Sequence, residues 1–163
     1  MAEAPQPGPV RTTAGYGIGD APADGSALPW SRVVDWLTGA RNYWVCTTRA
    51  DGRPHAMPVW GLWLDGTVWF STDPTSWKGR NLEARPDVVI HLESGDEVCV
   101  FEGTAERVRD AERLRRFDDV YLEKYDVRPS DMGEDAGVYV LRPTVALAWA
   151  EADFATSATR FTF

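Results

Sequence analysis

The feature that most constrains the fold is a series of short apolar segments joined by tight turns. Tyr43 to Thr48 is rich in aromatic and β-branched residues, and an Asp51-Gly52 turn separates it from the longer apolar run His55 to Leu64. A second turn, Asp65-Gly66, leads directly into the next run, Thr67 to Thr72. Since such short connections join antiparallel neighbours, the three runs are expected to form a meander.

The rest of the chain continues this pattern. Four further predicted strands share the composition: 88–92, 97–108, 138–141 and 145–149. We expect a bulge at Gly103, and a break at Arg142-Pro143-Thr144 between the last two strands. Three predicted helices accompany the strands: 31–40, 73–85 and 110–125. Because strands and helices do not alternate, the sequence predicts a mainly β fold, a closed antiparallel barrel of six or seven strands.

The beginning of the chain lacks this pattern. Residues 1–27 are rich in Pro, Gly and Ala and show no apolar periodicity, which is typical of a flexible tail. The length of 163 residues suits a single domain. We therefore expect an N-terminal tail over 1–27 and one folded domain over 28–163.

Charge and composition disfavour several classes of protein. The formal net charge of −8 argues against binding to nucleic acids or to an anionic membrane surface, because both need clustered cations. Cys46 and Cys99 lie in apolar runs, as buried cysteines of a reducing compartment do. No secretory signal and no apolar run long enough to span a bilayer are visible, so we expect a cytoplasmic protein.

Familiar catalytic motifs are missing from the sequence. His55 and His91 are the only histidines and do not have the spacing of metal ligands, so no metal site is expected. There is no GxSxG nucleophile motif, which disfavours a hydrolase of that type. GxGxxG and the phosphate-binding loop of NTPases are also absent.

The segment from Ser71 to Leu82 is the best candidate for a binding site. It passes from a predicted strand into the N-terminus of a predicted helix, where free backbone N–H groups and the helix dipole attract anions. Hydroxyl groups and one lysine accompany them: Ser71, Thr72, Thr75, Ser76 and Lys78. The chain contains only two lysines, Lys78 and Lys124, so a lysine at this position stands out. The alternative is an ordinary helix capped by Thr75 or Ser76 with a solvated lysine.

Three segments in this order resemble the split-barrel proteins of the pyridoxamine-phosphate-oxidase-like class, which bind flavins or deazaflavins. The first is Thr47 to Trp60, with the form TxxxDGRPHxxPVW. The second combines Phe70-Ser-Thr with Lys78 and Asn81-Leu82, and the third combines 86–90 with 102–108. The resemblance extends from about Trp30 to Phe163.

The resemblance implies a homodimeric split β-barrel with a cofactor site at the interface between the chains. The cofactor ring is expected against Met57, Pro58, Val59 and Trp60. Its phosphate is expected near the strand and helix that carry Ser71, Thr72, Ser76, Lys78 and Asn81. Arg160 is expected either to close over the partner's cofactor or to form a surface salt bridge. This chain departs from many relatives in having Ser76 and Trp77 where they have an arginine.

The same resemblance leaves the cofactor open between coenzyme F420 and FMN, and favours F420. It implies an oxidoreductase that transfers a hydride between the deazaflavin and an unsaturated or quinone-like small molecule. In that interpretation the protein positions and desolvates the reactants, and no side chain acts as a catalytic acid or base. The alternatives are an FMN-dependent oxidoreductase of the same fold and a flavin- or haem-binding protein without catalytic activity.

Overall fold

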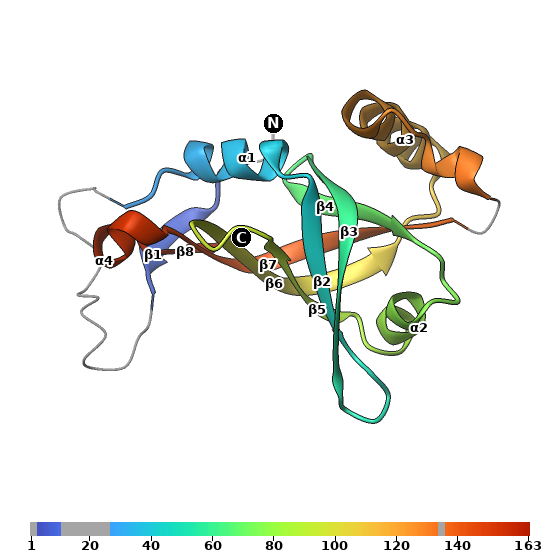
Figure 1. The fold of residues 1–163 in the computed structure, drawn as a ribbon, viewed down its shortest axis with the longest axis horizontal. Helices are drawn as coiled ribbons and strands as arrows, with labels where there is room; N and C mark the ends of the chain where they lie inside the picture. The colour runs from blue at the N-terminus through green and yellow to red at the C-terminus, as the bar shows by residue number, and fades with distance from the viewer. Residues whose placement is uncertain (1–2, 11–26, 134–135) are drawn as a thin grey trace.

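The computed structural model describes residues 3–10, 27–133 and 136–163. Its strands form one antiparallel sheet in the order β1-β8-β7-β4-β3-β2-β5-β6 (Figure 1). An additional pairing of β6 with β7 closes six of these strands into a barrel. The predicted mainly β fold with a closed antiparallel barrel is therefore confirmed.

The strands are β1 (Gln6–Pro9), β2 (Asn42–Thr48), β3 (Pro54–Leu64), β4 (Thr67–Thr72), β5 (Asp87–Leu92), β6 (Glu97–Arg107), β7 (Gly137–Ala150) and β8 (Thr159–Thr162). The helices are α1 (Trp30–Gly39), α2 (Trp77–Ala84), α3 (Ala111–Tyr125) and α4 (Phe154–Ser157). No helix of the described residues is long and apolar enough to cross a membrane.

Strand β7 is one long strand, where the sequence predicted two. One edge of β7 pairs with β6 along most of its length, while the other pairs first with β4 and then with β8. The change of partner coincides with the predicted break, because Pro143 offers no N–H and Thr144 is skipped in the register with β6. Gly103 faces this irregularity, where an added Cβ would lie 2.2 Å from the Arg142 carbonyl oxygen. The irregularity predicted at Gly103 is therefore present, but the extra residue is Thr144 of β7 and not a residue of β6.

The tail predicted over 1–27 is wrong for the residues of β1. Gln6 to Pro9 pair with β8 in antiparallel register, from Gln6 opposite Thr162 to Pro9 opposite Thr159. The exposed edge of β8 supplies the partner, so this segment needs no apolar periodicity of its own. The remainder of the predicted tail from residue 11 to 26 lies outside the described residues.

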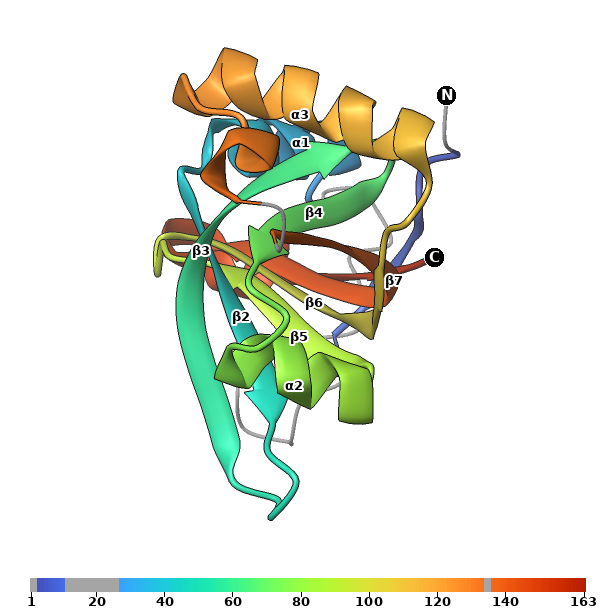
Figure 2. The ribbon, with the colours of Figure 1, turned by 90° about the vertical axis from the view of Figure 1, so that its right-hand side faces the viewer.

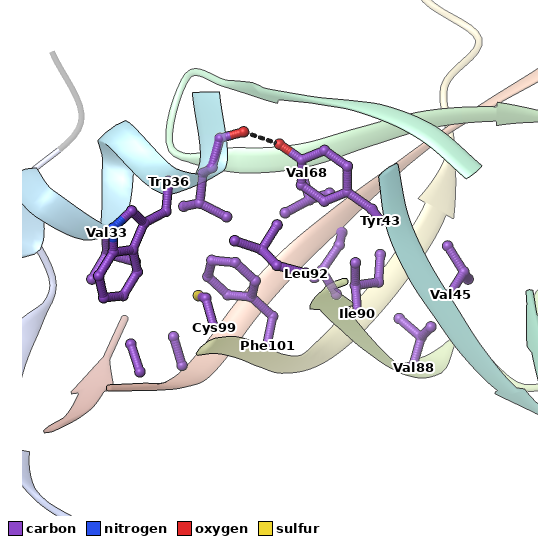
Figure 3. Packing of buried hydrophobic residues seen from close by; sticks show 14 of the residues in the cluster. Val33, Trp36, Tyr43, Val45, Val68, Val88, Ile90, Leu92, Cys99 and Phe101 are labelled. Carbon is purple, nitrogen blue, oxygen red and sulfur yellow. Dashed lines mark hydrogen bonds between the residues drawn. The ribbon is translucent and has the colours of Figure 1, made fainter. Parts of the chain in front are cut away.

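The barrel interior forms the larger of two apolar clusters. Strand side chains such as Val45, Val68 and Phe101 are fully or almost fully buried there, together with Cys99 (Figure 3). Helix α1 adds Val33, Trp36 and Leu37, and the hydroxyl of Tyr43 donates a hydrogen bond to the Leu37 carbonyl oxygen. Cys46, which the sequence suggested would be buried, is only partly so.

The second cluster lies on the outer face of the sheet, under α3. Phe117 and Tyr121 from the helix pack on outward-facing residues of β3, β4 and β7 that include Leu62, Trp69 and Val140. Asp110 begins this helix, since its carboxylate accepts the Arg113 N–H at 2.9 Å. The two clusters thus lie on opposite faces of the same strands.

Candidate functional site

The candidate site lies where α2 meets the hairpin of β2 and β3. Residues Pro54 to Trp60 of β3 pair with β2 on one edge, and β4 pairs with the other edge only from Gly61 onward. The described residues therefore leave the outer edge of β3 free along the part that contains Pro58. Figure 2 shows this hairpin extending past the barrel, with α2 at its side.

Ser76 caps helix α2. The sequence offered Thr75 and Ser76 as the two candidates for this cap. The Ser76 hydroxyl accepts the Gly79 N–H at 3.1 Å and lies 3.3 Å from the hydroxyl of Thr72 at the end of β4. The preceding turn, Asp73 to Thr75, is not helical, so the helix starts four residues later than 73. Gly79 fits tightly here, since an added Cβ would lie 2.4 Å from the Pro74 carbonyl oxygen.

A buried polar contact ties α2 to the hairpin. The Asn81 side-chain amide donates to the Thr47 hydroxyl at 2.9 Å, and both residues are 4% exposed. The same hydroxyl lies 3.5 Å from Nδ1 of His55, directly across the strand pair. Burial lowers the pKa of His55, and the nearby charges of Arg49 and Lys78 lower it further. His55 is therefore neutral at pH 7.

Cationic side chains gather around the first turn of α2. The guanidinium groups of Arg49 and Arg80 lie 5.0 Å and 4.7 Å from the ring centre of Trp77, whose side chain is 55% exposed. The Nε atom of Arg49 is buried and has no hydrogen-bond partner among the described residues. Lys78 is half-buried, and burial lowers its pKa. An anion placed here would satisfy these donors.

Backbone donors add to this cationic group. Within the described part of the chain, the N–H groups of Trp77 and Lys78 have no hydrogen-bond acceptor. One carboxylate lies at the same turn and opposes the positive charge. Asp73 accepts the Thr75 N–H at 2.7 Å, and hydrogen bonds from Thr75 lower the Asp73 pKa. With Lys78 and two guanidinium groups against this one carboxylate, the turn carries a net positive charge.

Strand alternation divides the predicted ring-binding run in two. Met57 and Val59 pair with the inward-facing Val45 and Tyr43, so they share the face that carries His55. Pro58 and Trp60 point to the other face, away from that row. The Trp60 ring stacks on Tyr125 of α3 with 4.9 Å between ring centres. Only the free backbone edge of this segment is common to all four predicted residues.

The predicted phosphate-binding residues also separate by face. Thr72, Ser76, Lys78 and Asn81 lie at or near α2, on the side of the barrel that this helix covers. Ser71 precedes Thr72 in β4 and points to the opposite face. Arg160 lies in β8, where it is paired with Leu147 and donates to the Thr162 hydroxyl at 2.8 Å. β8 and α2 lie at opposite ends of the molecule (Figure 1), so one chain does not bring Arg160 to this site.

Sequence reasoning missed four contributors to the site. Thr47, Arg49, His55 and Trp77 were not predicted as binding residues. Thr47, Arg49 and His55 lie within the TxxxDGRPHxxPVW segment. The resemblance of this segment to a known family was the signal that could have identified them, because their residue types alone do not indicate binding. The ring of Trp77 is contacted by two arginines, which brings cations to the first turn of α2.

A sequence model of the pyridoxamine 5'-phosphate oxidase family matches residues 30–150, which include every strand of the barrel. The chain belongs to this family. Its fold is the split barrel, in which β7 serves both the barrel and the β8 extension. No curated protein matches the sequence significantly.

Solved structures agree with this assignment. The chain is similar to a conserved hypothetical protein of Mycobacterium tuberculosis, with 26% identity, a TM-score of 0.68, and coverage of 76% of this chain and 85% of that one. It is also similar to a structure described as an F420 reductase, with 24% identity, a TM-score of 0.58, and coverage of 69% and 93%. A haem storage protein of Vibrio cholerae has 19% identity, a TM-score of 0.60, and coverage of 69% and 88%. The last two show the shared fold alone.

The residues of the site fit the phosphate of a flavin or deazaflavin. The unpartnered Arg49 Nε and the free N–H groups of Trp77 and Lys78 are donors that a phosphate oxygen accepts. Next to them, the free edge of β3 offers an apolar face in Met57 and Val59 for a flat ring.

Proposed function

We propose that this protein is an oxidoreductase that binds coenzyme F420, with FMN as the alternative cofactor, between α2 and the free edge of β3. The observation that carries the proposal is the cluster of unsatisfied donors at the first turn of α2. An acidic chain with a net charge of −8 repels anions in general, so a local cationic cluster of this kind needs a specific anionic ligand. A cofactor phosphate is such a ligand.

Each element has a separate task in this proposal. Lys78, Arg49 and the backbone of Trp77 and Lys78 hold the phosphate, while the β3 edge positions the ring. When bound, the cofactor supplies the hydride chemistry. The chain orients it and excludes water on the side of Met57 and Val59. The substrate class is an unsaturated or quinone-like small molecule.

Purified protein tests the cofactor most directly. We expect a deazaflavin absorbance band for F420, whereas a flavin band would indicate FMN. A haem Soret band would overturn the proposal and favour a haem-binding protein. If the purified protein carries no cofactor, titration with F420 and with FMN shows which of them it binds.

The Lys78→Ala variant tests the position of the phosphate. Loss of one charge-assisted hydrogen bond is expected to weaken cofactor binding by about 10- to 100-fold, or roughly 1.5–3 kcal/mol. Arg85→Ala is the matched control, because it removes one positive charge at the other end of α2, about 10 Å away. Equal affinities for both variants and wild type would place the phosphate elsewhere.

We also propose a homodimer that shares its cofactor sites between chains. Arg160 does not reach the α2 site of its own chain, so its predicted role requires a partner chain. Met57, Trp77 and Phe163 are large exposed apolar residues that such an interface would cover. Light scattering at micromolar concentration is expected to give the mass of two chains, and a monomer would contradict the proposal. Arg160→Ala is then expected to weaken cofactor binding about tenfold.

A further inference from the structure

A second hollow lies on the outer face of the barrel, at the C-terminal end of α3. It has a volume of about 370 Å³ and contains the other lysine of the chain, Lys124. It is formed by the end of α1, the start of β2, the middle of β3 and the end of α3, through Thr38, Gly39, Arg41, Trp60, Lys124, Tyr125 and Asp126. None of these residues other than Trp60 belongs to the site proposed above, and Trp60 contributes a different face.

The Lys124 amine is partly buried. Its Nζ donates to the Gly61 carbonyl oxygen at 3.1 Å, and lies 5.4 Å and 5.3 Å from the ring centres of Tyr43 and Tyr125. Among the described residues, no Asp or Glu lies within ion-pair distance of it. Burial lowers the pKa of Lys124 to about 8.

Two aromatic rings and one carbonyl oxygen face this amine, and no ionised phenol does. Burial raises the pKa of Tyr43 from β2 and of Tyr121 and Tyr125 from α3, so all three phenols are neutral at physiological pH. Arg41, which precedes β2, carries the same sign of charge as an ammonium group. Asp126 is the only carboxylate lining the hollow, and it is exposed. The lowered pKa gives Lys124 a larger share of neutral, nucleophilic amine at pH 7 than an ordinary lysine has.

A second cation, Arg41, lines the same hollow and can hold an anion. The Arg41 guanidinium lies 5.6 Å from the ring centre of Trp60, and Trp60 in turn stacks on Tyr125 with an interplanar angle of 4°. This stack holds an exposed guanidinium beside the hollow that contains the amine. Planar guanidinium groups bind phosphate oxygens through two parallel hydrogen bonds.

We propose that Lys124 is a modification site, acylated by a small acyl phosphate whose phosphate binds to Arg41. The neutral amine attacks the acyl carbon, a C–N bond forms, and the C–O bond to phosphate breaks. Inorganic phosphate leaves with the bonding electron pair, and the proton of the attacking amine passes to solvent. The product amide keeps one N–H for the Gly61 carbonyl oxygen and loses the positive charge.

Acetyl phosphate tests this proposal on the purified protein. Peptide mass spectrometry measures acetylation at Lys124, Lys78 and the N-terminal amine over time. We expect Lys124 to react about tenfold faster than the N-terminal amine, whose ordinary pKa is similar. The Lys124 rate should rise about tenfold per pH unit below pH 8 and level off above it, as the neutral amine does. An N-terminal amine rate equal to or above that of Lys124 would overturn the proposal.

The Arg41→Gln variant separates phosphate binding from simple amine reactivity. We expect it to slow acetylation of Lys124 by acetyl phosphate about tenfold, the scale of one charge-assisted contact. Acetylation by an uncharged N-hydroxysuccinimide ester should change less than twofold, because that reagent has no phosphate to bind. No change with acetyl phosphate, or an equal loss with both reagents, would overturn the role of Arg41. Circular dichroism checks that the variant is folded.

Discussion

The two ends of the barrel are covered by helices of similar length but opposite character. Helix α1 covers one end and buries Val33, Trp36 and Leu37, while helix α2 covers the other and buries Gly79, Asn81 and Leu82. Both helices contact β2 through hydrogen bonds. At the α1 end the Tyr43 hydroxyl bonds to the backbone of Leu37, and at the α2 end Thr47 bonds to the side chain of Asn81.

The difference in what the two helices bury suggests that the α1 end serves mainly stability and the α2 end mainly ligand binding. A fully buried leucine contributes about 1.5–3 kcal/mol, so the α1 end stabilises the fold. A buried amide contributes less and must be satisfied, but it holds its helix in one position. The α2 end therefore positions the cationic cluster, and it leaves the donors of the first turn free for a ligand.

Leu37→Ala at the α1 end should have the largest effect on stability. Leu37 is 0% exposed, and the cavity is expected to lower the free energy of unfolding by about 2–5 kcal/mol. Urea denaturation measures this loss. Asp35→Ala, on the exposed face of the same helix, is the control, and it should lower the free energy of unfolding by less than about 0.5 kcal/mol. Cofactor affinity of the folded variant should stay within about twofold of wild type. A tenfold loss of affinity would show that the two ends are not independent.

Gly79→Ala at the α2 end should disturb both stability and binding. The new Cβ would lie 2.4 Å from the Pro74 carbonyl oxygen and 2.5 Å from its Cα, and backbone atoms cannot swing away. We expect a loss of about 1–3 kcal/mol by urea denaturation, together with weaker cofactor binding as the turn before Ser76 shifts. Gly39→Ala in α1 is the matched control, since no atom lies within 4 Å of its new Cβ. If Gly79→Ala were as stable as that control, the tight contact with Pro74 would be contradicted.

Thr47→Val removes the acceptor of the buried amide without changing the shape of the side chain. Asn81 Nδ2 is then left without its partner, which is expected to cost about 1–2 kcal/mol in thermal or urea unfolding. Thr48→Val is the control, because the described residues give the Thr48 hydroxyl no hydrogen bond. Equal stabilities of the two variants would mean that the Asn81 amide finds another acceptor.

Ser76→Ala should have the smallest effect of the four substitutions. Loss of the hydroxyl that accepts the Gly79 N–H is expected to cost about 1 kcal/mol. Ser31→Ala in α1 is the comparison, since α1 begins one residue earlier and has no side-chain cap. Ser31 lies inside α1 and does not cap it, so this variant should change the melting temperature by less than about 1 °C. A comparable loss in both variants would contradict the assigned caps.

Local sequence signals predicted most of the elements. The turns Asp51-Gly52 and Asp65-Gly66 separate β2, β3 and β4 as expected, and Pro58 lies on a strand edge that the described residues leave free. Residue preference is sufficient for such features, because turns and edges depend on neighbours along the chain. The run from Ser71 to Leu82 likewise contained most of the α2 contribution to the candidate site.

The partners of each strand were beyond the reach of the sequence. Arg142-Pro143-Thr144 was interpreted as a break between strands, but it is where β7 changes its partner from β4 to β8. The strand β1 also depends on its partner, since Gln6 to Pro9 have no strand pattern of their own. Long-range pairing provides the hydrogen bonds in both cases, and no local preference reports it.

The site shows the same division. Residue types and order along the chain were enough to identify a mainly β barrel and to predict an anion-binding helix start with Lys78. Folding added Thr47, Arg49 and His55 to Lys78 and Asn81, because the β2–β3 hairpin lies beside α2. It also turned Trp60 and Ser71 to the other face, since alternate side chains of a strand point in opposite directions. Which side chains share a ligand depends on strand register and on the packing of α2, and both arise from contacts between residues far apart in the chain.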